Sequence, residues 1–175
     1  MSIVVKNLTY RHSDNTILFK NISFSINKGE KVALIGNNGS GKSTLLYLMQ
    51  RYLNVQEGEI IMSSPSYYVP QHFEQYSKQT VAEALKVDDK INALHSILNG
   101  DVTAENFSIL NEDWNIEEKS LAALSFWGLS HIPLHQKMET LSGGEKTKVF
   151  LSGIQIHAPA ILLMDEPTNH LDKPS

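Results

Sequence analysis

Alternating hydrophobic and polar positions at the start of the chain predict short β-strands. The runs 3–5, 17–19 and 22–26 are rich in β-branched and aromatic residues, and turns of Asn, Asp and Ser separate them. In the third run, serines alternate with apolar residues, which is typical of a strand with one face in water. We therefore predict an N-terminal antiparallel β-layer.

A continuous apolar run at residues 31–35 follows this layer. Runs of this kind are typical of parallel strands that are buried on both faces. Apolar residues then recur at helical spacing over residues 45–53. The glycine-rich segment 36–43 separates the two, so the order strand, loop, helix is predicted.

The segment 36–43 has the phosphate-binding pattern Gly-x-x-x-x-Gly-Lys-Ser. Its glycines let successive backbone N–H groups point at an anion, and the following helix adds the positive end of its dipole. Lys42 would supply a cation to the β- and γ-phosphates, and Ser43 a hydroxyl ligand to Mg²⁺. The candidate nucleotide-binding residues are Gly36, Asn37, Asn38, Gly39, Ser40, Gly41, Lys42, Ser43 and Thr44.

Two more strands are predicted at residues 58–62 and 67–69, and Pro70 ends the second one. Gln71 then lies at a strand tip, where its amide can contact a metal ion or the water bound to it. From residue 72 to 140 the pattern is helical, beginning with a capping box at Thr80-Val81-Ala82-Glu83.

A second helix that could face phosphate begins after Leu141, at Ser142-Gly143-Gly144-Glu145. Ser142 and Glu145 form a capping box, and the two glycines leave the first N–H groups of the helix unobstructed for an anion. Taken alone, this pattern is weak support for a binding site.

A buried strand at residues 161–164 ends in two acidic residues, Asp165 and Glu166. Neighbouring side chains of a strand point in opposite directions, so the two carboxylates can have different roles. We expect Asp165 to hold Mg²⁺ through its water shell and Glu166 to polarise the water that attacks the γ-phosphate.

Composition excludes several classes of site. The 175 residues contain no cysteine, so disulfides, thiol nucleophiles and cysteine-ligated metals are excluded. The formal net charge of −4 gives no electrostatic support for nucleic-acid binding. No apolar run is long enough to span a bilayer, and the N-terminus lacks the pattern of a secretion signal. We predict a cytoplasmic protein.

In their order along the chain, these motifs resemble those of the nucleotide-binding domain of ATP-binding cassette (ABC) proteins. Residues 36–43 correspond to the Walker A motif, 141–145 to the signature motif and 161–166 to Walker B. The resemblance implies an α/β P-loop NTPase fold with a mostly parallel core sheet, an N-terminal antiparallel β-layer and an inserted helical subdomain. It places the ATPase core and β-layer in residues 1–71 and 141–175, and the helical subdomain in residues 72–140.

The resemblance also implies roles for single residues. Tyr10, which on residue type alone is more simply a half-buried strand residue, occupies the position of the adenine-stacking aromatic. Gln71 falls in the Q-loop, with a catalytic and Mg²⁺-binding role. Glu166 is the catalytic base, and Ser43 and Asp165 are metal ligands. The signature residues Ser142, Gly143, Gly144 and Glu145 would act in trans, on ATP bound to a second ABC domain.

A finer resemblance concerns Glu166-Pro167-Thr168-Asn169-His170-Leu171-Asp172, which contains the D-loop and looks like a sequence frequent in the ABC-F branch. Members of that branch carry two such domains in one chain and act on ribosomes, so the ribosome or tRNA would be the partner. The short span from Gln71 to Leu141 argues against a long ribosome-contacting arm. The alternatives are the ATP-binding subunit of a membrane transporter and an ATP-dependent dimerisation switch.

One departure from the family follows the D-loop. The family has a switch histidine on a later strand, and this sequence has none after His170. We therefore expect the C-terminal part of the domain to be absent and the core sheet to have an open slot. We also expect weak or absent ATP hydrolysis until a second ABC domain, from the same chain or a homodimer, completes the site.

Overall fold

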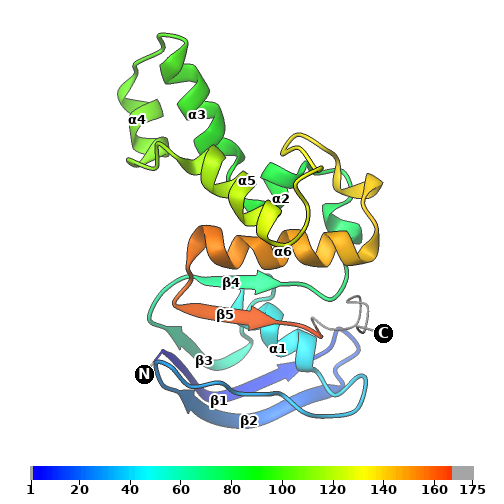
Figure 1. Cartoon of the computed structure of the whole chain (residues 1–175). Helices are drawn as coiled ribbons and strands as arrows, with labels where there is room; N and C mark the ends of the chain where they lie inside the picture. Colours follow the sequence, from blue (N-terminus) through cyan, green and yellow to red (C-terminus); the bar gives the residue numbers. More distant parts are fainter. Residues whose placement is uncertain (1, 167–175) are drawn as a thin grey trace. The chain divides into compact units, whose positions relative to one another are not determined.

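The structure is a computed structural model that describes residues 2–166 (Figure 1). The described residues divide into two compact units. The first contains residues 2–68 and 159–165, and the second contains residues 69–158 and Glu166. The functional boundaries predicted above, with a helical subdomain at 72–140, remain a prediction.

An antiparallel sheet forms one side of the first unit. It consists of β1 (Ile3–Arg11), β2 (Ile17–Ile26) and β3 (Glu57–Met62), in the order β2-β1-β3. Ile3 lies opposite Ile26 on one side and Met62 on the other. Along β2, half-buried residues alternate with exposed serines, as the sequence pattern predicts. The N-terminal antiparallel β-layer is thus confirmed, and β3 also belongs to it.

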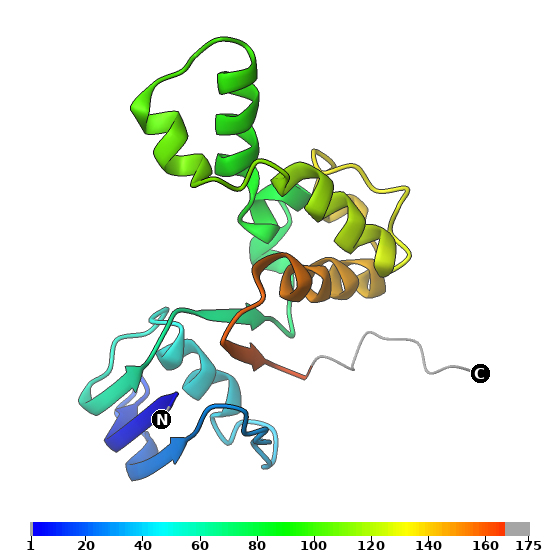
Figure 2. The same ribbon diagram turned by 60° about the vertical axis from the view of Figure 1, so that its left-hand side comes forward.

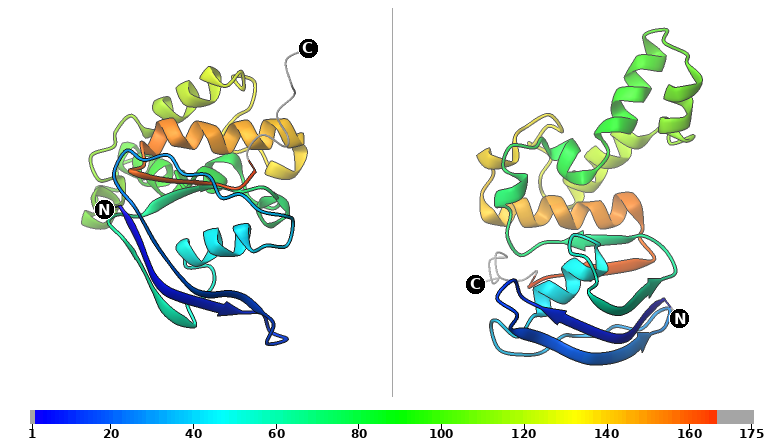
Figure 3. Two further views of the ribbon diagram at one scale, coloured as in Figure 1. Left: turned by 90° about the horizontal axis from the view of Figure 1, so that it is seen from below. Right: turned by 180° about the vertical axis from the view of Figure 1, so that it is seen from behind.

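A second sheet and one helix complete this unit. The sheet pairs β4 (Ser66–Val69) with β5 (Ile161–Met164), and Figure 1 draws both arrows in the same direction. Helix α1 (Lys42–Met49) lies between the two sheets in Figures 1 and 3. The buried core accordingly joins side chains of β1, α1, β4 and β5, among them Leu8, Leu48, Tyr68 and Ile161.

The strand predicted at residues 31–35 is not formed in the structure. This segment is irregular and exposed, with Val32 60% and Ile35 95% accessible to solvent. A parallel strand needs neighbours on its edges to bond its backbone, and among the described residues β4 and β5 pair only with each other. The apolar run indicates a buried strand, but the structure shows no pairing partner for it within residues 2–166.

The second unit is helical (Figure 2). Helices α3 (Asp88–Leu98) and α4 (Ala104–Leu110) pack as a hairpin. Helices α2 (Val81–Leu85) and α5 (Ile116–Phe126) pack on α6 (Gly143–His157). Short 3₁₀ turns occur at Glu74–Tyr76 and Met138–Thr140. No helix within residues 2–166 is long and apolar enough to cross a membrane.

Candidate functional site

The glycine-rich loop is shaped by residues with left-handed backbone conformations. Gly39 and Gly41 have φ angles of +80° and +93°, a region that residues with a Cβ rarely adopt. Between them, the N–H of Ser40 donates to the carbonyl of Asn37 over 3.1 Å and closes a turn. The loop therefore curls immediately before α1, as the motif predicts.

The N-terminus of α1 is open to an anion. Gly41 occupies the N-cap position and provides no side-chain cap, and the first turn contains no acidic residue. The first N–H groups of a helix have no partner inside the helix, and the helix dipole makes this end positive. By contrast, Thr80 caps α2 and Ser142 caps α6. The end of α1 is therefore suited to bind a phosphate group.

Lys42 contributes a cation at the same place. Its ammonium donates to the carbonyl oxygens of Gly36 and Asn37, at 3.0 and 3.3 Å, so the side chain folds back over the loop. A Cβ on Gly36 would lie 2.7 Å from the hydroxyl oxygen of Ser40, so a side chain at this position would require the Ser40 hydroxyl to turn away. The donors that the loop offers are those that phosphate requires.

The two predicted magnesium ligands of the first unit, Ser43 and Asp165, both carry oxygen donors. Ser43 and Thr44 lie in the first turn of α1 and are half-buried. Asp165, directly after β5, is 3% exposed and accepts a hydrogen bond from the hydroxyl of Tyr68 over 3.3 Å. Mg²⁺ prefers oxygen ligands, commonly one or two carboxylates with several waters. The hydroxyl of Ser43 and the carboxylate of Asp165 are therefore donors of the right kind.

Gln71 and Glu166 meet in the second unit. The side-chain amide of Gln71 donates to Oε2 of Glu166 over 2.7 Å, and both residues are half-buried. Ninety-five positions separate them in the sequence. Gln71 follows Val69 and Pro70, where β4 ends, as predicted. The sequence analysis gave Gln71 a catalytic and Mg²⁺-binding role but named no protein partner for it, and the contact with Glu166 is a finding of the structure.

The segment after Gln71 is anchored to α6. Phe73 stacks on Phe150 with ring centroids 5.7 Å apart, and Tyr76 meets the same ring edge-on at 4.8 Å. Phe150 is 2% exposed and lies on the helix that Ser142 caps. Stacked and edge-on aromatic pairs fix relative position. Packing thus links the Gln71 segment to the signature helix, which local sequence patterns do not reveal.

The capping box of α6 forms as predicted. The hydroxyl of Ser142 accepts from the N–H of Glu145, and Oε2 of Glu145 accepts from the N–H and the hydroxyl of Ser142 at 2.8 and 2.7 Å. The backbone hydrogen bond from Ser142, followed by the bond from its hydroxyl, lowers the pKa of Glu145. His131 approaches Oε1 of Glu145 at 3.3 Å, a contact that the sequence analysis missed. Gly143 and Gly144 form the first turn.

The structure describes Tyr10 but not the predicted D-loop. Tyr10 lies on β1 opposite Phe19, packs against the buried core and meets His12 edge-on at 6.3 Å. Its adenine-stacking role remains a prediction. The D-loop residues 169–172 lie outside the described residues.

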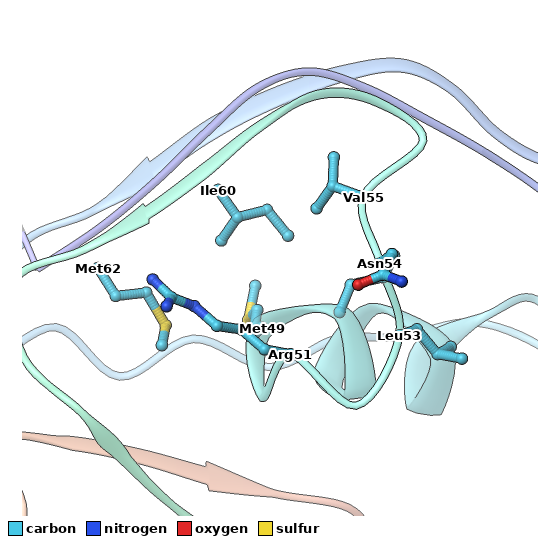
Figure 4. Close-up of a pocket in the computed structure, with 8 residues that line it drawn as sticks. Met49, Arg51, Leu53, Asn54, Val55, Ile60 and Met62 are labelled. Carbon is cyan, nitrogen blue, oxygen red and sulfur yellow. The ribbon is translucent and has the colours of Figure 1, made fainter.

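An open pocket in the first unit does not belong to this site. It has a volume of about 230 Å³ and lies between the C-terminal end of α1 and strand β3 (Figure 4). Met49, Arg51, Ile60 and Met62 are among its lining residues. The phosphate-binding loop is at the opposite end of α1, so the pocket and the loop are distinct.

Comparison with known protein families matches residues 19–169 to the family described as ABC transporter. The chain belongs to this family. The match contains the phosphate-binding loop, the signature segment and both acidic residues after β5. The chain is thus an ABC nucleotide-binding domain, and domains of this family bind ATP, typically with Mg²⁺.

Curated relatives carry several names. The chain is 32% identical to "Uncharacterized ABC transporter ATP-binding protein YfmM" of Bacillus subtilis, over 99% of the chain and 38% of that protein. It is 35% identical to "ABC transporter F family member 2" of Arabidopsis thaliana, over 99% of the chain and 23% of that protein. It is 30% identical to "Tylosin resistance ATP-binding protein TlrC" of Streptomyces fradiae, over 94% of the chain and 34% of that protein. The chain thus spans roughly a quarter to two-fifths of these relatives.

Solved structures support the fold. An ATP-binding subunit of an ABC transporter superposes with a TM-score of 0.70 and 23% identity, over 98% of the chain and 69% of that subunit. The P-loop NTPase fold predicted from the motifs is confirmed at this level.

Proposed function

We propose that this domain binds Mg·ATP and hydrolyses it as the first of two ABC domains in an ABC-F protein. Lys42 and the N–H groups of residues 36–43 hold the phosphates, and Ser43 and Asp165 hold Mg²⁺. Glu166 polarises the attacking water, and Gln71 contacts the metal or its water. The open end of α1 and the acids after β5 support this assignment.

The hydrogen bond from Gln71 to Glu166 is the observation that best supports hydrolysis. A general base must be fixed within hydrogen-bond reach of the proton that it removes. The side-chain amide of Gln71 donates to Oε2 of Glu166 and so orients the carboxylate. If Gln71 also contacts the metal or its water, binding of Mg·ATP would change the orientation of the Glu166 carboxylate through this hydrogen bond.

A second ABC domain would complete the site. Phosphate needs donors on the face opposite the loop, and the signature end of α6 offers them in trans through Ser142 and the N–H groups of Gly143 and Gly144. Adenine would stack on Tyr10. Steady-state phosphate release should therefore rise when the second domain is added, and equal rates with and without it would refute this arrangement.

The ABC-F assignment is supported by the segment 166–172 and by the similarity to the F family member of Arabidopsis. We propose the ribosome as the partner, in translation or in antibiotic resistance. The complete Glu166→Gln protein, which should trap ATP, is sedimented with ribosomes, and the complete Lys42→Ala protein is the control. We expect ATP-dependent pelleting of the first variant alone. Absence of pelleting would favour a transporter subunit.

The transporter alternative is favoured by the similarity to the Bacillus subtilis protein, whose name describes an ABC transporter ATP-binding protein. In that case the domain docks on a membrane subunit, and its ATP hydrolysis responds to that subunit and is insensitive to ribosomes. Measuring ATP hydrolysis with added ribosomes therefore separates the two functions.

A further inference from the structure

A buried tyrosine contacts the predicted magnesium ligand. Tyr68, on β4, is 6% exposed, and its hydroxyl donates to Oδ2 of Asp165. Asp165 follows β5, the neighbour of β4 in the two-stranded sheet. Because Asp165 is itself 3% exposed, few water molecules can replace this donor. A buried carboxylate depends strongly on such bonds for its orientation.

The ring of Tyr68 is held by two further tyrosines. It meets Tyr47 edge-on with centroids 5.9 Å apart and Tyr52 at 6.3 Å, and Tyr47 and Tyr52 are 6.1 Å from each other. Tyr47 lies on α1, four positions after Ser43, so the two residues share one side of the helix. The cluster thus connects Asp165 to the helix that carries the other predicted magnesium ligand.

The hydroxyl of Tyr68 acts as a donor in this contact. Its partner atom, Oδ2 of Asp165, is a carboxylate oxygen, which accepts hydrogen bonds, so the phenol O–H is the donor. Its proton points to Asp165 and leaves the second carboxylate oxygen for other ligands.

We propose that Tyr68 is a positioning residue for Mg²⁺, because it fixes the carboxylate of Asp165 relative to Ser43 on α1. The inference rests on the proposed function, since it assigns a purpose to a contact beside the metal. A purely structural role would change only the stability of the fold, whereas a positioning role also changes the metal affinity and leaves the metal-free nucleotide affinity constant.

Tyr68→Phe tests the proposal, since it keeps the ring and removes only the hydroxyl. The measurement is Mn²⁺ affinity of the ATP-bound complete protein, read by electron paramagnetic resonance, with binding of a fluorescent ATP analogue in EDTA measured separately. We expect Mn²⁺ affinity to fall about tenfold, as for loss of a hydrogen bond to a charged group, and metal-free nucleotide affinity to change less than twofold. Tyr52→Phe is the control, because Tyr52 belongs to the ring cluster and does not bond Asp165; its Mn²⁺ affinity should match the wild type.

A mutant cycle extends the test. In an Asp165→Asn background, where the carboxylate is gone, Tyr68→Phe should change Mn²⁺ affinity less than twofold. Unchanged Mn²⁺ affinity in the folded single variant, whatever its melting temperature, would overturn the positioning role. A wild-type protein that binds no ATP analogue would overturn the proposed function as well, so the two failures are distinguishable.

Discussion

Replacing Gly41 by alanine tests whether the phosphate-binding loop needs glycine for its shape. Gly41 has a φ of +93°, and a Cβ there would lie 2.5 Å from Cε1 of Phe19 and 2.9 Å from Cδ2 of Leu18. The left-handed backbone costs a residue with a Cβ about 1–2 kcal/mol, and overpacking adds about 1–3 kcal/mol. We therefore expect Gly41→Ala to lower the free energy of unfolding by about 2–5 kcal/mol.

The matched control is Gly39→Ala. Gly39 has a φ of +80°, but a Cβ there meets no heavy atom within 4 Å. This variant should lose only the backbone contribution of about 1–2 kcal/mol. Urea denaturation followed by circular dichroism measures both variants.

A double-mutant cycle isolates the steric part. In a Phe19→Ala background, Gly41→Ala should cost less than in the wild type, and the remaining contact with Leu18 should keep its cost above that of Gly39→Ala. Equal costs for the two glycine variants in the wild-type background would refute the contact of Gly41 with Phe19 as the cause.

The other predictions concern the two helix ends. Lys42→Ala removes the ammonium over the loop and should weaken ATP binding at least about tenfold in equilibrium titrations; unchanged affinity would contradict its role. Ser142→Ala should cost about 1 kcal/mol, because it removes the N-cap of α6. The lowered pKa of Glu145 means that its stabilisation is present above its ordinary pKa of 4.5 and is lost as the pH falls below it. Melting curves of Glu145→Gln against pH should therefore lack this loss.

Local patterns were enough to predict most of the elements. Serine alternation predicted the exposed face of β2, and capping boxes placed the starts of α2 and α6 at Thr80 and Ser142. These signals involve residues within a few positions of each other, where backbone geometry determines which side chains meet. The left-handed backbone conformations of Gly39 and Gly41 before α1 are likewise a consequence of the local sequence.

Contacts between distant residues could not be predicted in this way. The hydrogen bonds from Gln71 to Glu166 and from Tyr68 to Asp165 join residues that are 95 and 97 positions apart. A hydrophobic pattern within a few residues cannot predict such contacts. The strand predicted at residues 31–35 was wrong for a related reason. Its hydrophobicity indicates burial, but a strand forms only beside a partner, and pairing depends on the whole sheet.

In the proposed function, the loop at residues 36–43 holds Mg·ATP while Glu166 activates water. Single-turnover hydrolysis and ATP binding are measured with the complete Glu166→Gln protein. We predict ATP affinity within about twofold of the wild type and hydrolysis slowed by at least about a hundredfold, as expected for loss of a general base. Hydrolysis at the wild-type rate would contradict the account.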